Sequence, residues 1–119
     1  MDEKIMNIEE FRDYCLSLPQ VEEKMPFGAF RWASSILAFY VGGKIFCFID
    51  IEKCDLCTLK CDPSLIDGLK SQYSAVGRPF NMNPKYWIGV SLNEDVDDIT
   101  LRSLIKASYE IVKTATRQG

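Results

Sequence analysis

The chain has 119 residues, of which 47% are hydrophobic and 26% charged, and its net charge is −3. This size and composition are those of one globular domain. The acidic balance opposes non-specific attraction to a polyanion, so a nucleic-acid role requires a local basic patch. The longest apolar run, Ile36–Val41, is too short to span a bilayer, and the N-terminus lacks a secretory signal. We therefore expect a cytoplasmic protein with no membrane partner.

The first predicted element is a helix that begins at Asn7 and ends at Leu18. Asn7 is a suitable N-cap, with Glu10 three residues later to complete a capping-box-like pair. The apolar residues inside the segment recur with helical spacing. Pro19 ends the helix, because the residue before a proline is pushed out of the helical region. Residues 19–28 then read as a connector, and residues 30–32 as a short strand.

A β-hairpin follows, in which two β-rich runs flank Gly42 and Gly43. A two-residue turn needs positive φ, which glycine adopts freely. Both runs are apolar at alternate and intervening positions, which indicates central strands with at least partial cover on the second face. The further predicted elements are a strand at 56–60, a helix capped by Asp62 with Pro63 at its first position, a loop at 74–85, a strand at 87–91 and a helix from Asp97 or Asp98.

Runs of strands bounded by helices indicate an α+β fold rather than alternating βα units. We therefore expect one domain, spanning residues 1–119. It should contain a single antiparallel sheet of about five strands, packed against N-terminal, middle and C-terminal helices. No internal repeat or low-complexity tract divides the chain.

The residue types narrow the chemistry. The chain contains no histidine, which removes the commonest general base and any His-containing nucleophilic or zinc site. Three of its five cysteines crowd together at Cys54, Cys57 and Cys61, but a structural zinc site needs four ligands. We interpret these thiols as structural, with a metal or redox site as the alternative. We predict no enzymatic activity, no metal and no cofactor.

Basic and aromatic residues form the more suggestive pattern. Lysines open one strand of the hairpin and close the strand at 56–60, and polar residues line the loop before the last strand. Cations beside an aromatic ring can hold phosphates and stack bases. The alternative is that the lysines are solvated strand ends and the tryptophan belongs to the core. The candidate binding residues are Lys44, Lys60, Arg78, Asn83, Lys85, Tyr86 and Trp87.

Six segments in order resemble the MmcQ/YjbR family of small bacterial proteins, and together they cover about residues 7–113. They are Phe11–Pro19 (FRDYCLSLP), Met25–Gly28 (MPFG), Val41–Phe46 (VGGKIF), Leu59–Pro63 (LKCDP), Asn83–Ile88 (NPKYWI) and Ser108–Val112 (SYEIV). The resemblance implies an α+β fold akin to the frataxin (CyaY-like) sheet. It also implies a "double-wing" arrangement, which is associated with DNA binding.

Two functions are therefore open. The resemblance implies a DNA-binding module, and Lys44, Lys60, Asn83, Lys85 and Trp87 match its motifs. The acidic net charge and the polar-aromatic loop instead favour a domain that binds a protein or small ligand and has no nucleic-acid role. The iron-binding acidic ridge of frataxin-like proteins does not carry over, because the first helix is too sparse in carboxylates.

Overall fold

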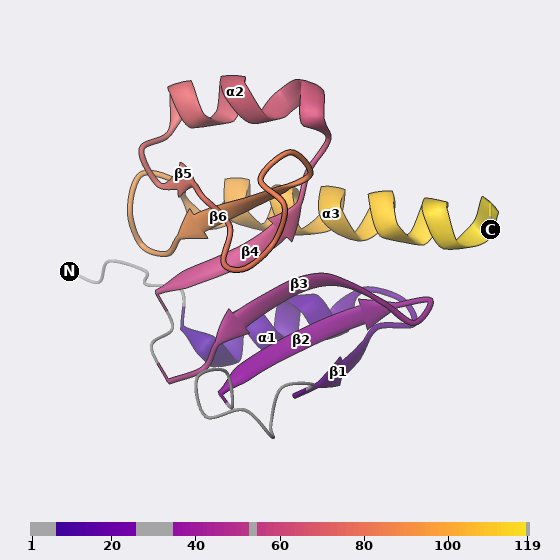
Figure 1. The fold of residues 1–119 in the computed structure, drawn as a ribbon. Helices are drawn as coiled ribbons and strands as arrows, with labels where there is room; N and C mark the ends of the chain where they lie inside the picture. Colours follow the sequence, from indigo (N-terminus) through magenta and orange to yellow (C-terminus); the bar gives the residue numbers. More distant parts are fainter. Residues whose placement is uncertain (1–6, 26–34, 53–54, 119) are drawn as a thin grey trace.

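The computed structural model describes residues 7–25, 35–52 and 55–118, with side chains to residue 115. These residues form three helices and one six-stranded sheet (Figure 1). In chain order the elements are α1 (Ile8–Ser17), β1 (Glu22–Lys24), β2 (Ile36–Val41), β3 (Lys44–Asp50), β4 (Leu56–Lys60), α2 (Pro63–Gln72), β5 (Val76–Gly77), β6 (Trp87–Ser91) and α3 (Asp98–Gln118). The predicted α+β class is confirmed.

Each helix begins where a side-chain oxygen satisfies a free backbone N–H. Asn7 Oδ1 accepts from the N–H of Glu10 at 2.9 Å, as predicted for α1. Asp62 Oδ1 caps α2 in the same way, with proline at the first helical position. Asp97 Oδ1 accepts from the N–H of Thr100 at 2.8 Å at the start of α3. The three predicted helix starts are therefore confirmed.

The strands are antiparallel and follow the order β1-β2-β3-β4-β6-β5. Gly42 and Gly43 have φ of 62° and 82°, so the predicted tight hairpin joins β2 and β3. The described part of the sheet contains two strands that were not predicted, because the predicted connector contains β1 and the predicted loop contains β5. The short strand predicted at 30–32 lies outside the described residues.

Different elements pack on the two faces of the sheet. One face, which we call the helix face, carries the main core and packs against α1 and α3. The opposite face, which we call the loop face, carries a smaller cluster of Ile36, Ala38 and Phe48. A β-bulge at Phe46 breaks the alternation of β3, so that Phe46 and Cys47 both join the main core.

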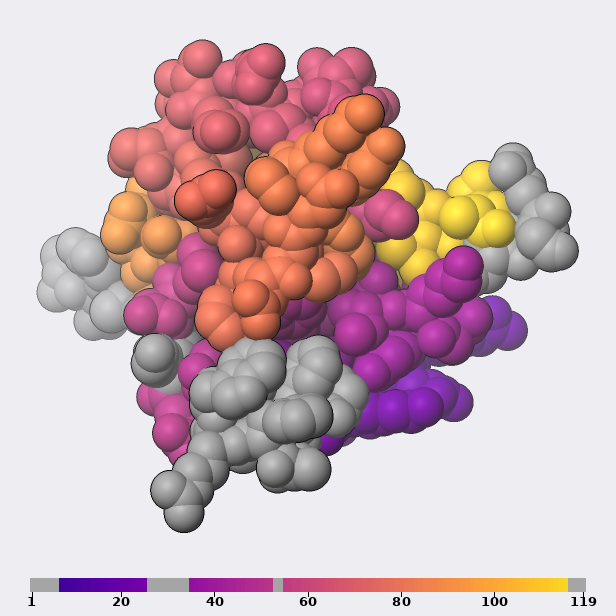
Figure 2. Space-filling model, viewed as in Figure 1, coloured from indigo at the N-terminus to yellow at the C-terminus, as the bar shows by residue number. Residues whose placement is uncertain are grey.

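The loop face takes its name from residues 78–86, which cross it over β6 and β4 (Figure 1). The main-chain oxygen of Arg78 lies so close to Gly89 that a Cβ there would come within 2.2 Å of it. The N–H of Phe80 donates to Thr58 Oγ1 at 3.2 Å, and the Phe80 ring meets the Phe48 ring edge-on. Figure 2 shows this loop, in orange, across the centre of the visible surface.

Among the residues that the structure describes, no helix combines the length and apolar character needed to cross a membrane.

Candidate functional site

The candidate residues gather at one end of the sheet because of the strand directions. β2 ends and β3 begins at this end, where Val41 pairs with Lys44. β4 ends and β6 begins at the same end, where Lys60 pairs with Trp87. β5 is antiparallel to β6, so Arg78 also emerges there. We call this region the basic end; its cations are Lys44, Lys60, Arg78 and Lys85.

Lys60 and Trp87 form the centre of the basic end. They are cross-strand neighbours on the loop face, and the Lys60 ammonium lies 5.8 Å from the centroid of the Trp87 ring. The Trp87 side chain is only 9% exposed. The ring therefore supports the lysine rather than presenting a free surface.

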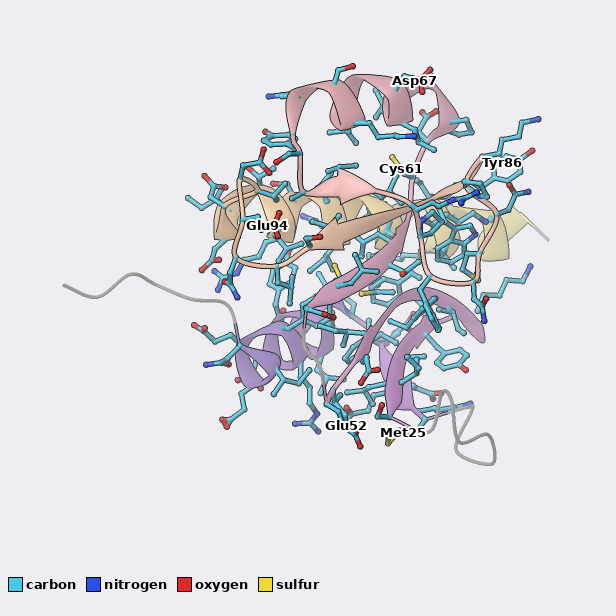
Figure 3. The ribbon with its side chains drawn as sticks, turned by 60° about the vertical axis from the view of Figure 1, so that its left-hand side comes forward. Met25, Glu52, Cys61, Asp67, Tyr86 and Glu94 are labelled. Atoms are coloured by element: carbon cyan, nitrogen blue, oxygen red, sulfur yellow. The ribbon has the colours of Figure 1, made fainter. Side chains whose placement is uncertain are left out.

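The turn before β6 positions Lys85 and Tyr86. Asn83 Oδ1 accepts from the N–H of Lys85 at 2.9 Å, and the Asn83 carbonyl accepts from the N–H groups of Tyr86 and Trp87. This is an Asx-type turn, so Asn83 builds the site through its local hydrogen bonds. The Tyr86 ring is 40% exposed, and the Lys85 ammonium lies 5.6 Å from its centroid. Figure 3 shows Tyr86 at the periphery of the molecule.

Lys44 and Arg78 are exposed and flank this centre. Lys44 shares a face with its partner Val41, which belongs to the helix-face core, so it points away from Lys60 at the same end. Arg78 begins the loop that covers Gly89. The structure thus brings Lys60, Lys85, Tyr86 and Trp87 together, and places Lys44 and Arg78 beside them.

The charges of the molecule are separated along the strands. In the described part of the chain, none of the four cations of the basic end forms an ion pair. Acidic neighbours at that end are Glu22, Asp62 and Glu110. The opposite end is much more acidic, and Figure 3 places Glu94 there, across the molecule from Tyr86. Its carboxylates are Asp50, Glu52, Asp55, Glu94, Asp95, Asp97 and Asp98.

A buried hydroxyl that the sequence analysis did not single out holds the centre in place. Ser108 of α3 is fully buried; its Oγ accepts from the N–H of Lys60 at 2.9 Å and donates to the carbonyl of Phe46. The β3–β4 ladder ends at the pair Cys47–Leu59, and beyond this pair the hydroxyl bridges the two strands. The sequence signal for this buried hydroxyl is that Ser108 falls inside the apolar stripe of the last helix.

The thiols lie apart from the basic end, except for Cys61. Cys15, Cys47 and Cys57 are fully buried in the core. Burial is the main cause that raises the pKa of Cys47 well above its ordinary value, with the neighbouring thiol of Cys15 adding to it. Cys54 lies outside the described residues. Among those described, no group of three Cys, Asp or Glu side chains is arranged to hold a metal ion.

The fold is that of a small α+β protein with one helix-covered antiparallel sheet. A model of the YjbR family matches residues 16–111. The chain belongs to the YjbR family, which confirms the resemblance seen in the sequence.

Two relatives from Escherichia coli match most of the chain. YbdF of strain O157:H7 is 32% identical over 115 residues, which cover 94% of this chain and 88% of YbdF. YjbR of strain K12 is 26% identical over 106 residues, which cover 88% of this chain and 86% of YjbR. Both relatives are described as uncharacterised proteins.

Solved structures agree with the fold. The Deinococcus radiodurans protein DR2400, with a DUF419 domain, matches with a TM-score of 0.80 and 24% identity, over 94% of this chain and 82% of its own. A Pseudomonas syringae protein matches with a TM-score of 0.74 and 22% identity, over 90% of this chain and 99% of its own. At these identities the likeness shows the architecture alone.

Proposed function

We propose that the protein is a DNA-binding module and that the basic end is its DNA-binding surface. The observation that carries the proposal is the separation of charge along the sheet. Although the net charge is −3, cations without ion-pair partners among the described residues gather at one end, and carboxylates gather at the other. This distribution attracts a polyanion to one end and repels it from the other.

The side chains at the basic end have distinct roles in this proposal. Lys60 and Lys85 contact phosphates, and Lys44 and Arg78 extend the positive surface on either side. Tyr86, whose ring is the most exposed aromatic surface at this end, stacks on a base. The Trp87 ring packs against the Lys60 side chain and holds its ammonium group in position. A single exposed ring flanked by lysines favours a single strand, whose bases are free to stack.

The test measures binding of two fluorescein-labelled oligonucleotides, one single-stranded and one duplex, by fluorescence anisotropy at two salt concentrations. Two phosphate contacts, from Lys60 and Lys85, predict a slope of log K against log salt of about −1.4, so affinity for the single strand should fall about sevenfold between about 50 and 200 mM salt. The double variant Lys60→Glu with Lys85→Glu should abolish binding to both oligonucleotides.

The matched control is Lys106→Glu, because Lys106 is exposed on α3, which covers the helix face, whereas Lys60 lies over Trp87 on the loop face. Lys106→Glu changes the net charge of the protein by the same amount as Lys60→Glu or Lys85→Glu. A difference in DNA binding between these variants therefore reports the position of the charge and not the net charge. Binding by this variant should stay within about twofold of the unaltered protein at constant salt. No detectable binding of either oligonucleotide at low salt refutes the proposal, and so does equal weakening by Lys106→Glu and Lys60→Glu.

A further inference from the structure

A second feature lies on the other side of the β4 terminus: a half-open groove of about 590 Å³ between α2 and α3. Its volume is within the range of small-molecule sites. One face of α2 and one face of α3 form its walls, and Ile88 of β6 contributes to its floor. Cys61 also lines it, and Figure 3 shows this side chain beneath α2. The apolar lining residues are Leu65, Leu69, Ile88, Leu104, Ala107 and Ile111.

Gly68 keeps this groove wide. It lies in the interior of α2, where glycine is a poor helix former, and its φ is not in the left-handed region. A Cβ at this position would meet no atom within 4 Å, so neither backbone conformation nor packing requires glycine. Glycine at this position lowers the helix propensity of α2 and leaves space in the groove. We interpret this space as room for a bound molecule.

The charges that face the groove are negative. Lys60 lines it, but its ammonium lies over Trp87, on the loop face. The remaining charged lining residues are Asp62 and Glu110. The N–H of Ser64 is the main cause that lowers the pKa of Asp62, so this carboxylate stays ionised at neutral pH. An occupant with a positive group therefore matches the groove, whereas an anionic one does not.

We propose that the groove between α2 and α3 binds a small organic cation with an apolar body, whose ammonium group lies near Asp62 and Glu110. The apolar body fills the space beside Gly68 and contacts the leucine and isoleucine side chains. The proposal does not depend on DNA binding, because it is argued from the residues that line the groove, and neither Lys85 nor Tyr86 is among them.

The experiment titrates the whole protein with 4-phenylbutylammonium and, separately, with 4-phenylbutyrate, followed by amide chemical shifts. The two probes share one apolar body and differ in charge. The cation should shift the amides of Gly68 and Ala107 and bind about fivefold more tightly than the anion, as expected for an exposed charge pair. Glu110→Gln should reduce that preference, while Glu94→Gln, at the acidic end, should leave it unchanged.

Gly68→Leu tests the groove itself without weakening the fold. Leucine fills open space and is a better helix former than glycine, so the variant should unfold at the same or higher urea concentration. It should also lose at least tenfold in affinity for 4-phenylbutylammonium, whereas Gly68→Ala should lose less.

Three results would overturn the proposal: no shifts at Gly68 with millimolar cation, equal affinity for both probes, or unchanged binding in folded Gly68→Leu. Light scattering provides a fourth check. A dimer that becomes a monomer in Gly68→Leu would show that a second copy of the chain occupies the groove.

Discussion

Replacing Ser108 with alanine tests how the basic end is anchored. The hydroxyl links α3 to the end of the β3–β4 ladder, since it bridges the N–H of Lys60 and the carbonyl of Phe46. Alanine leaves both backbone groups without this partner in a buried region. Each such loss costs about 1–2 kcal/mol, and the higher helix propensity of alanine returns about 0.5 kcal/mol. The expected net loss of stability is therefore about 1.5–3.5 kcal/mol.

Urea denaturation followed by circular dichroism measures this loss, and Ser103→Ala is the matched control. Ser103 is exposed on the same helix, so its replacement changes helix propensity and nothing in the core. That control should be neutral or more stable by up to about 0.5 kcal/mol. If Ser108→Ala lies within about 1 kcal/mol of Ser103→Ala, the bridging role of the hydroxyl is refuted.

Two further substitutions test the loop face and the α1–β1 contact. Gly89→Ala should cost about 2–3 kcal/mol and weaken DNA binding, because its Cβ would meet the Arg78 carbonyl at 2.2 Å and displace the loop. Its cross-strand partner Gly77, where a Cβ meets nothing, should tolerate alanine; equal urea midpoints for the two variants contradict this reasoning. Arg12 donates from Nε to Glu23 at 2.7 Å and lowers the pKa of that carboxyl. The pair therefore stabilises the fold above the ordinary pKa of glutamate and stops doing so as pH falls through the lowered pKa. The urea midpoints of the unaltered protein and Arg12→Gln should therefore differ at neutral pH, and the difference should shrink as pH falls below the ordinary pKa of glutamate, about 4.3. A difference that stays constant from neutral to acid pH would refute this reasoning.

Much of the fold could be predicted because local signals agreed with tertiary structure. Asn7, Asp62 and Asp97 are caps in both the sequence and the structure, and the Gly-Gly turn fixes the hairpin register. β1 was not predicted, because its three residues are charged and it pairs with β2 only at the sheet edge. β5 has two residues, too few for any periodicity to appear.

The candidate site was predicted in part. The sequence pattern predicts that Lys44, Lys60 and Trp87 lie at strand ends. The face of the sheet on which each side chain lies depends on the pairing register of the strands. The burial of Trp87 under Lys60 follows from a cross-strand pair, which no local pattern encodes. Ser108 could not be assigned a role for the same reason, since its partners Lys60 and Phe46 lie 48 and 62 residues away in sequence.

The groove was also beyond sequence reasoning, and the end of β4 shows why it is separate from the basic end. Consecutive residues of a strand point to opposite faces, so Lys60 lies over Trp87 while Cys61 lines the groove. One strand end thus contributes a cation to the loop face and an apolar wall to the helix side. Lys85 belongs to the basic end and does not line the groove, so charge reversal at Lys85 and filling of the groove at Gly68 perturb the two surfaces independently. A loss of DNA binding and a loss of cation binding can therefore be assigned to different residues of one small domain.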